Sequence, residues 1–529
     1  MQVSCFRQKR ENTIKTGNAD VERRTWNVVR FFTPSRISQL FFLALFLYLF
    51  IITDYRGRDE INVGVNSFFR MDPLVLVSHV LAAKSLTWLL FPALLMVLFT
   101  VFLGRFFCGW ICPLGTLIDL VTRKIPKSGP VRFLKGGFRY YLLFTLLVSA
   151  LFSVNVSGIF DPITLLIRAL AFFFYPLLGL AARSGWSSLY ALVGDSRDSV
   201  LFLHDFLRAY ILPFRETLYP LSFVSFVLIV SIFAIESFER RNWCRNICPL
   251  GTLLGLFGRF SLFRRIPGRL CEDCGDCRKN CPTAFDGEIP QSGDCIRCMD
   301  CRAACNVRRV HFRPGLPSFS TAGTSGQPVL SRRLLLTSVV FGIVLAKGFS
   351  FRKPQAQIRL LRPPGVMDEG IFFEKCVRCG ECMKVCLRSA LYPDFSLGGV
   401  TGIFMPVIIP RLGYCEYNCT LCGQVCPTGA IPRLSPEEKK KSIIGTAVID
   451  RNLCLPYAKK LNCLVCEEHC PIPDKAIRFE SVTDIDYRGE RISLKRPYVI
   501  EELCNGCGIC ENKCPLEGRS AIEVFSRKK

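Results

Sequence analysis

The residues of this chain whose types and spacing could do chemistry are its cysteines, which number 29 among 529 residues. Only four histidines accompany them, too few for bis-histidine haems or for zinc fingers with two histidine ligands each. From residue 271 onward, 24 cysteines fall into six groups of four, most of them spaced CxxCxxCxxxC. The groups are Cys271, Cys274, Cys277 and Cys281; Cys295, Cys298, Cys301 and Cys305; Cys376, Cys379, Cys382 and Cys386; Cys415, Cys419, Cys422 and Cys426; Cys454, Cys463, Cys466 and Cys470; and Cys504, Cys507, Cys510 and Cys514.

This spacing is that of bacterial ferredoxins, in which three thiolates of a tight loop and one more distant thiolate bind 4Fe-4S clusters. Zinc sites usually take two separated pairs of cysteines instead. The groups therefore predict six 4Fe-4S clusters, with iron held by these cysteines. In the first two groups we expect Cys305 to join the first trio and Cys281 the second. Among the last four groups, neighbours could exchange their fourth cysteines, or the first could pair with the last and the middle two together.

Four apolar runs in the first half approach the length of about 20 residues that a bilayer requires. They cover residues 37–53, 86–104, 140–158 and 219–237. Basic residues follow the second and fourth runs, around 123–139 and 240–265, which predicts that those segments and the amino terminus are cytoplasmic. The apolar run 163–182 could be re-entrant or interfacial, and if it spans, this topology is wrong.

The membrane half contains one pattern twice. CxxxCP followed by Leu-Gly-Thr-Leu begins at Cys108 and again at Cys244, and an Asp-Pro pair precedes each motif, at Asp72 and at Asp161. We therefore predict two parallel halves related by an axis along the membrane normal. Paired halves would bring four thiols together, either to bind one additional centre or as structural or redox-sensing thiols. These thiols are Cys108, Cys112, Cys244 and Cys248.

A linker rich in Gly, Pro and Ser precedes another apolar run. Arg332 and Arg333 stand before the apolar stretch 334–346, as in a twin-arginine export signal or in an anchor that obeys the positive-inside rule. Both interpretations place the rest of the chain in the periplasm, and an uncleaved segment would form a fifth span.

The expected fold class is an α-helical polytopic membrane domain, with four to five spans and an internal repeat, joined to α+β ferredoxin-like 4Fe-4S domains. The expected domains are a membrane domain (1–260), a cytoplasmic two-cluster ferredoxin domain (261–312), a linker with signal or anchor (313–350) and a periplasmic four-cluster ferredoxin domain (351–529). The net charge of +25 is explained by basic inner loops, so we expect a membrane and no nucleic acid as partner.

With these motifs the chain resembles two families joined end to end. Residues 1–312 resemble NapH, a ferredoxin-type membrane quinol dehydrogenase, in the four spans, the CxxxCP motifs and the first two quartets. Residues 331–529 resemble NapG, an exported four-cluster ferredoxin with a twin-arginine start. The membrane motifs are also similar to those of the NosR and CcoG families. The resemblance implies electron transfer from membrane quinol, the substrate, to a periplasmic reductase or cytochrome, in a multi-pass protein of the bacterial inner membrane.

Quinol oxidation also needs groups that accept two protons, and ionisable residues in or near the membrane are the default candidates. These are Asp72, His79, Asp161 and His204, although Asp-Pro is equally an ordinary helix start and either histidine could be merely interfacial. A NosR-like or CcoG-like maturation or redox-regulatory role, and electron entry from a cytoplasmic donor into the quinone pool, are the alternatives. About 30 Å of hydrocarbon would separate inner from outer clusters, and the CxxxCP centre or quinone could bridge it.

Overall fold

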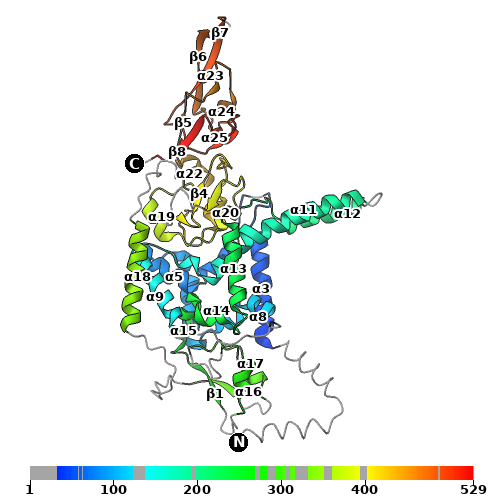
Figure 1. The fold of residues 1–529 in the computed structure, drawn as a ribbon, viewed down its shortest axis with the longest axis vertical. Helices are drawn as coiled ribbons and strands as arrows, with labels where there is room; N and C mark the ends of the chain where they lie inside the picture. The colour runs from blue at the N-terminus through cyan, green and yellow to red at the C-terminus, as the bar shows by residue number, and fades with distance from the viewer. Residues whose placement is uncertain are drawn as a thin grey trace.

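The computed structural model describes residues 33–57, 59–61, 63–122, 125, 137–192, 197–267, 274–283, 293–305, 310–315, 332–350, 360–393, 402–485 and 489–527. Three parts follow one another along its long axis (Figure 1). We call them the basal part (described residues within 261–315), the helix bundle (those within 33–260, and 332–350) and the distal part (those within 360–527).

The basal part is a two-stranded antiparallel sheet with two short helices. Strand β1 (Phe263–Pro267) pairs with β2 (Val310–Pro314), and the helices are α16 (Asp276–Lys279) and α17 (Asp300–Ala303). Hydrogen bonds join this part to the bundle, because Ser35 Oγ donates to the Cys298 carbonyl at 2.9 Å and Trp110 Nε1 donates to the Arg297 carbonyl at 3.0 Å.

The bundle consists of α-helices with short 3-10 and π segments. They are α3 (Pro34–Ile52), α4 (Asn66–Arg70), α5 (Pro73–Ala83), η1 (Trp88–Leu90), α6 (Phe91–Leu103), α7 (Phe106–Trp110), α8 (Pro113–Thr122), α9 (Phe138–Leu151), η3 (Ser157–Ile159), α10 (Pro162–Ala169), η4 (Leu170–Phe174), α11 (Tyr175–Leu192), α12 (Arg197–Tyr210), α13 (Ser222–Ile235), α14 (Asn242–Asn246), α15 (Pro249–Gly258) and α18 (Arg332–Ser350).

Proline fixes the start of several of these helices, since its missing N–H is one that the first turn leaves unpaired anyway. Asp72 caps α5 by accepting from the Leu74 and Val75 N–H groups, and Asp161 caps α10 by accepting from the Thr164 N–H. Both Asp-Pro pairs are therefore helix starts, the ordinary alternative that the sequence offered.

Two described helices are long and apolar enough to cross a membrane, Pro34–Ile52 and the continuous run Pro162–Ser188. The runs expected at 86–104, 140–158 and 219–237 form shorter apolar helices. The second run opens with the 3-10 turn η1, and α9 ends before Ser153, which has a positive φ of 64°. The number of spans therefore stays a prediction.

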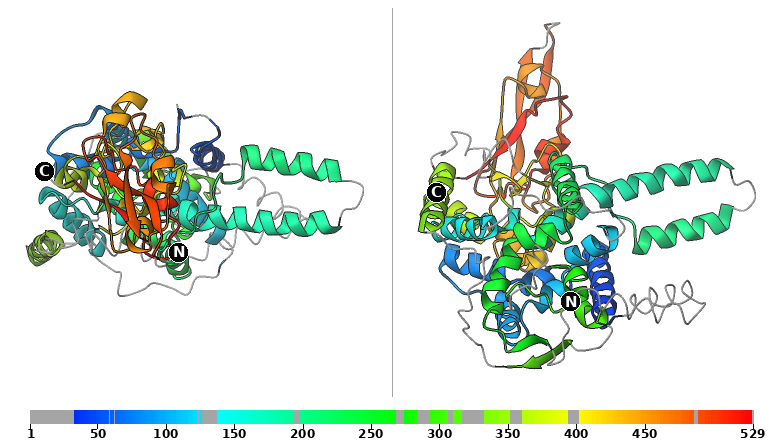
Figure 2. Two further views of the ribbon diagram at one scale, coloured as in Figure 1. Left: turned by 90° about the horizontal axis from the view of Figure 1, so that it is seen from above. Right: turned by 60° about the horizontal axis from the view of Figure 1, so that its bottom comes forward.

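Helices α11 and α12 form an arm that projects sideways from the bundle (Figure 2). Gly179 lies against Pro213 and Glu216 at its base, and Arg183 pairs with Glu216 at 3.1 Å. The run 163–182 thus begins among buried residues at α10 and continues into this arm.

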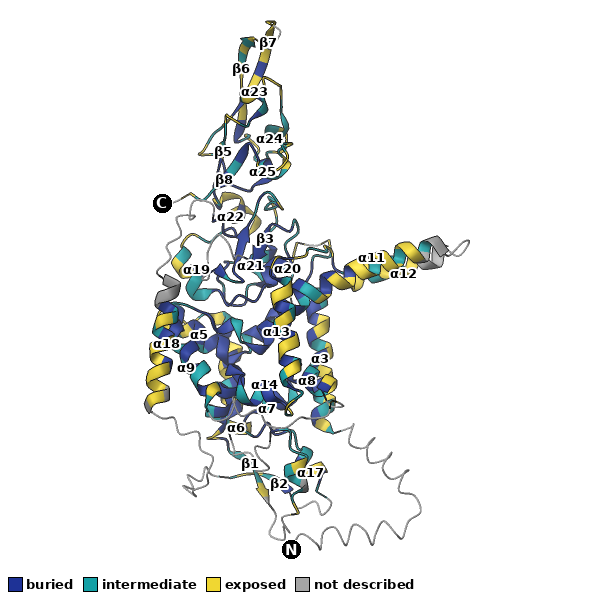
Figure 3. Cartoon of the chain, viewed as in Figure 1, coloured by how far each residue is buried: buried dark blue, intermediate teal, exposed yellow. Residues whose placement is uncertain are grey.

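Helix α18 lies beside α9 and leads from the basal side of the bundle toward the distal part (Figure 1). Gly342 faces Val148, and Thr145 Oγ1 donates to the Ser338 carbonyl at 3.5 Å. The opposite side of α18 is exposed (Figure 3) and apolar, with Leu336 66% and Val340 60% exposed. Such a surface suits contact with lipid.

The distal part contains three antiparallel strand pairs, β3–β4, β5–β8 and β6–β7. Its elements are α19 (Glu369–Lys375), α20 (Glu381–Lys384), β3 (Leu391–Pro393), β4 (Pro406–Ile408), α21 (Leu421–Val425), α22 (Pro436–Lys441), β5 (Thr446–Ile449), α23 (Leu455–Ala458), α24 (Val465–Glu468), β6 (Ile477–Ile485), β7 (Arg491–Val499), α25 (Ile509–Lys513) and β8 (Ile522–Phe525). The long β6–β7 hairpin forms the far tip (Figure 1).

Leucine in place of Gly342 should overfill the contact between α18 and α9. A Cβ atom at Gly342 would stand 2.7 Å from Val148 Cγ1 and 3.2 Å from the Thr145 carbonyl oxygen, and overpacking costs about 1–3 kcal/mol. We expect Gly342→Leu to lower the thermal unfolding midpoint of the detergent-solubilised full chain, whereas Val340→Leu on the exposed side leaves it unchanged. Equal midpoints for the two variants would contradict this packing.

Candidate functional site

The cysteines of the distal part form four sites, each made of residues of two different quartets, and three of these sites border a pocket. We call these sites D1 to D4. D1 contains Cys376, Cys379, Cys382 and Cys426; D2 contains Cys386, Cys415, Cys419 and Cys422; D3 contains Cys470, Cys504, Cys507 and Cys510; D4 contains Cys454, Cys463, Cys466 and Cys514. Neighbouring quartets therefore exchange their fourth cysteines, one of the two patterns that the sequence left open.

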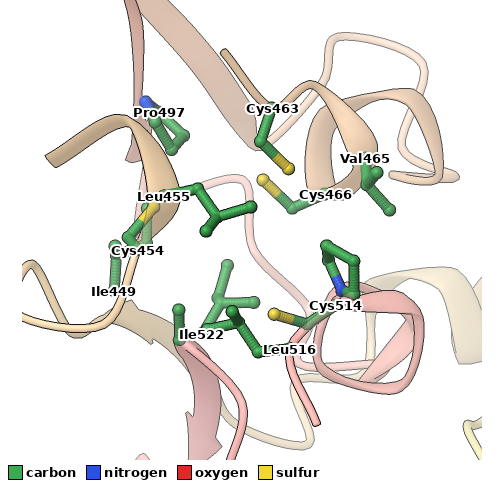
Figure 4. A pocket seen from close by; sticks show the side chains of 12 residues that line it. Ile449, Cys454, Leu455, Cys463, Val465, Cys466, Pro497, Cys514, Leu516 and Ile522 are labelled. Carbon is green, nitrogen blue, oxygen red and sulfur yellow. The ribbon is translucent and has the colours of Figure 1, made fainter. Parts of the chain in front are cut away.

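D4 shows how such a pocket is built. The sulfur atoms of Cys463, Cys466 and Cys514 point into it, and apolar side chains such as Leu455 and Ile522 fill the remaining wall (Figure 4). The pocket is therefore a sulfur-lined space with apolar walls, which suits an iron–sulfur cluster held by cysteine thiolates.

The basal part has one comparable pocket. Cys281 lies there with the second trio, and Cys277 also reaches its wall. Cys274 is exposed and Cys305 is partly buried, while Cys271 lies outside the described residues. We call this space the basal pocket; it is lined by Cys277, Cys281, Cys295, Cys298 and Cys301.

The shape of these sites favours clusters over single metal ions. In the described ranges, no three His, Cys, Asp or Glu side chains form a group that could hold one metal ion. D1, D3 and D4 instead border empty spaces of about 310 to 400 Å³. Cysteines spread around such a space suit a cube of iron and sulfide better than a single zinc ion.

The four distal cysteine sites form a line that begins at the bundle. Next to D1, the backbone of Gly158 contacts the Val377 carbonyl, and Tyr219 Oη donates to the Met383 carbonyl at 2.9 Å. D1 adjoins D2, and D3 adjoins D4, through their exchanged cysteines. D2 adjoins D3, because the Cys415 N–H donates to the Cys507 carbonyl at 2.9 Å.

Two titratable side chains lie where D1 meets the bundle, Glu381, which is buried, and Lys384, which is partly buried. No sequence pattern pointed to either residue. Burial raises the pKa of Glu381 to about 8, and neither carboxyl oxygen has a hydrogen-bond partner among the described residues. Burial lowers the pKa of Lys384 to about 8, and its ammonium group donates to the Phe50 and Thr53 carbonyls at the end of α3.

The bundle contains a further cysteine pocket, formed by both CxxxCP motifs. We call it the bundle pocket; it is lined by Cys108, Cys112, Cys244 and Cys248, with Leu114, Gly115, Pro162, Leu250 and Gly251. The two motifs have matching local structure. Each begins in a five-residue helix, α7 or α14, and its second cysteine directly precedes the proline that starts α8 or α15.

Of the four residues considered for proton transfer, the structure brings two together. Asp72 and Asp161 are fully buried and their carboxyl groups lie within hydrogen-bonding reach of each other. His79 is also buried and its Nε2 lies 2.8 Å from Thr87 Oγ1. His204 lies apart from these residues, on α12 of the arm, beside Asp205 and Trp186.

Comparisons with known proteins agree with iron–sulfur chemistry. A family model described as a 4Fe-4S binding domain matches residues 85–132 and again 218–269, and a second model of the same description matches 497–517. The methylamine utilization ferredoxin-type protein MauM of Methylorubrum extorquens is 34% identical over 207 residues, which cover 37% of this chain and 90% of MauM. The ferredoxin-type protein NapG of Escherichia coli is 33% identical over 209 residues, which cover 38% of this chain and 88% of NapG.

The chain belongs to the MauM and NapG family of ferredoxin-type proteins. It is also similar to the ferredoxin-type protein NapH of Haemophilus influenzae, at 28% identity over 312 residues that cover 54% of this chain and 91% of NapH. That alignment is longer than the distal part, so the NapH likeness includes other parts of the chain. No solved structure matches the chain.

The family membership establishes a ferredoxin-type iron–sulfur electron-transfer protein of the Nap and Mau kind. The two candidate spanning helices and the NapH likeness support association with a membrane. Both findings agree with the resemblance to NapH and NapG inferred from the motifs.

Alanine in place of Gly158 should loosen the junction between D1 and the bundle. Its Cβ atom would stand 1.8 Å from the Val377 carbonyl oxygen, a backbone atom that cannot swing aside. We expect Gly158→Ala to speed proteolytic release of the distal part from the full chain while leaving bound iron unchanged. Gly185→Ala is the matched control, since nothing lies within 4 Å of that Cβ, and equal rates for the two variants would contradict the contact.

Proposed function

We propose that the protein oxidises membrane quinol and passes the electrons through D1, D2, D3 and D4 to a periplasmic reductase, or to a cytochrome that serves one. The observation that carries this proposal is the line of four cysteine sites that starts against the bundle and ends near the far tip. Such a line has one end at the membrane, where quinol dissolves, and the other where a water-soluble acceptor can dock.

In this proposal the cysteines of D1 to D4 and of the basal part hold six 4Fe-4S clusters. Each cluster carries one electron at a time, and hydrogen bonds and exposure set its potential. Quinol gives two electrons and two protons, so the site of oxidation needs proton acceptors beside the first cluster. Glu381 beside D1, and the Asp72 and Asp161 pair, are the buried carboxyl groups best placed for this task.

The proposed topology keeps the amino terminus and the basal part in the cytoplasm and the distal part in the periplasm, with a multi-pass bundle in the bacterial inner membrane. The position of α18 beside α9 supports an uncleaved fifth span that carries the chain across. One family model that matches twice, each time over a CxxxCP motif, supports an internal repeat. We propose these domain limits: the membrane domain covers 1–260, the cytoplasmic ferredoxin domain 261–312, the linker with its anchor 313–350 and the periplasmic ferredoxin domain 351–529.

The relatives' names point to more than one acceptor. MauM is named for methylamine utilization, whereas NapG and NapH carry another system's name. We therefore propose an acceptor by class, a periplasmic redox protein that docks near D4, and keep a nitrate reductase-like system as its leading example.

Reduced quinol should reduce the distal clusters of the full chain without any other donor. The test is electron paramagnetic resonance of the anaerobic protein in proteoliposomes, before and after addition of a quinol analogue, with the oxidised quinone as control. We expect the signals of reduced clusters to appear within the mixing time after quinol is added. No such signals should appear after the oxidised quinone is added. Clusters that dithionite reduces but quinol does not would contradict quinol oxidation and favour a maturation role.

A further inference from the structure

We propose that the bundle pocket holds one further 4Fe-4S cluster, shared between the two CxxxCP motifs. The family model for a 4Fe-4S binding domain matches each motif separately, yet each matched segment contains only two cysteines, Cys108 and Cys112 in one and Cys244 and Cys248 in the other. A cluster takes four thiolates. One cluster held jointly by both segments therefore satisfies both matches.

The pocket borders an empty space at the lower end of the range found at the other cysteine pockets. Its empty volume of about 310 Å³ equals that of D3. Cys108, Cys112 and Cys248 are all less than 10% exposed. Apolar residues, glycine and proline make up the rest of its lining, so no competing ligand occupies it.

Backbone dipoles favour thiolates at this place. The Gly115 N–H points at Cys112 Sγ at 3.5 Å, and the Gly251 N–H points at Cys248 Sγ at 3.3 Å. Both N–H groups belong to the first turn of a ten-residue helix, α8 or α15. The positive ends of two helix dipoles thus meet at the pocket, where they stabilise negative sulfur.

Two buried arginines add positive charge. Arg105 and Arg241 each stand three residues before the first cysteine of a motif, and they are 2% and 1% exposed. Each crosses to the other motif, because Arg105 Nη2 donates to the Cys244 carbonyl at 3.3 Å and Arg241 Nη1 donates to the Cys108 carbonyl at 2.7 Å.

The acidic partners of these arginines lie at the edge of the site. Asp294 pairs with Arg105 and Asp119 with Arg241, and their side chains are 34% and 39% exposed. Glu236 is buried near Cys244, but it caps α14 by accepting from the Asn242 and Trp243 N–H groups. Asp161 is a further buried carboxyl group near Cys112, and it caps α10 by accepting from the Thr164 N–H. The two guanidinium groups supply positive charge at the pocket, which favours a four-thiolate cluster of net negative charge.

The bundle pocket also lies between the basal pocket and D1. The backbone of Gly109 contacts the Ile296 carbonyl, and Ile296 lines the basal pocket. Pro162 lines the bundle pocket, and Gly158, four residues earlier, contacts Val377 of D1. Four residues reach at most about 14 Å, well short of the hydrocarbon thickness. A cluster here would take one electron from a reduced neighbour and give it to the next; this relay role rests on the proposed function, whereas the site itself does not.

The test counts clusters in the anaerobically purified full chain. We expect coulometric titration to take up about seven electrons, with about 28 iron atoms per chain, rather than about six and about 24. In the double variant Cys108→Ser with Cys244→Ser, the electron count and the iron count should both fall by the amount that corresponds to one cluster. The control variant Cys5→Ser changes a cysteine that lies outside every group, and both counts should stay as in the wild type. The proposal would be overturned if the wild type took up only six electrons, or if it held one zinc ion in place of the seventh cluster. It would also be overturned if the double variant kept all seven clusters.

The role of Arg105 can be tested separately, through the midpoint potentials of the clusters. Arg105→Gln should leave iron content unchanged and make the midpoint potential of one cluster more negative, because a lost positive charge favours the oxidised form. Arg105→Lys should restore most of the shift. An unchanged set of potentials would overturn the role of Arg105. Seven clusters that quinol fails to reduce would contradict the proposed function alone.

Discussion

An iron–sulfur cluster needs four thiolates, and in this chain the pockets that the structure describes draw them from two separate stretches of sequence. D1 joins Cys382 to Cys426, and D4 joins Cys466 to Cys514. The surrounding secondary structure is sparse, since the distal sheets have only two strands each, and isolated two-stranded sheets are marginally stable. Shared coordination is therefore what would hold these loops in place, so cluster binding and folding depend on each other.

The sharing of cysteines between distant loops also sets the distances between neighbouring cluster sites. Exchanged cysteines keep D1 beside D2 and D3 beside D4, and glycines allow backbones to touch where no cysteine is exchanged. Gly158 at D1 and Gly109 above the basal pocket are the two clearest cases, because any side chain there would meet a carbonyl group. Glu381 is buried at the junction of D1 with the bundle, where electron transfer and proton release would have to be coupled.

The cysteine groups could be predicted from sequence because their spacing is local and specific to one kind of ligand set. The exchange of fourth cysteines could not, because it depends on how two distant loops pack. Both CxxxCP motifs are preceded by an arginine three residues before the first cysteine, Arg105 or Arg241, and this was visible in the sequence. Only the structure shows that each arginine donates a hydrogen bond to the other motif. Glu381 gave no signal, since one glutamate between cysteines looks like a surface residue. Helix lengths were overestimated where a positive φ or a 3-10 turn interrupts an apolar run.

We infer that iron lies in an unbroken series from the basal part, through the bundle, to the far tip. An anomalous difference map at the iron absorption edge, from anaerobically grown crystals of the full chain, tests this directly. Strong peaks in the basal part, in the bundle pocket and in each of D1 to D4 would agree with it. A map with no iron between the basal part and D1, or with iron scattered outside the cysteine pockets, would contradict it.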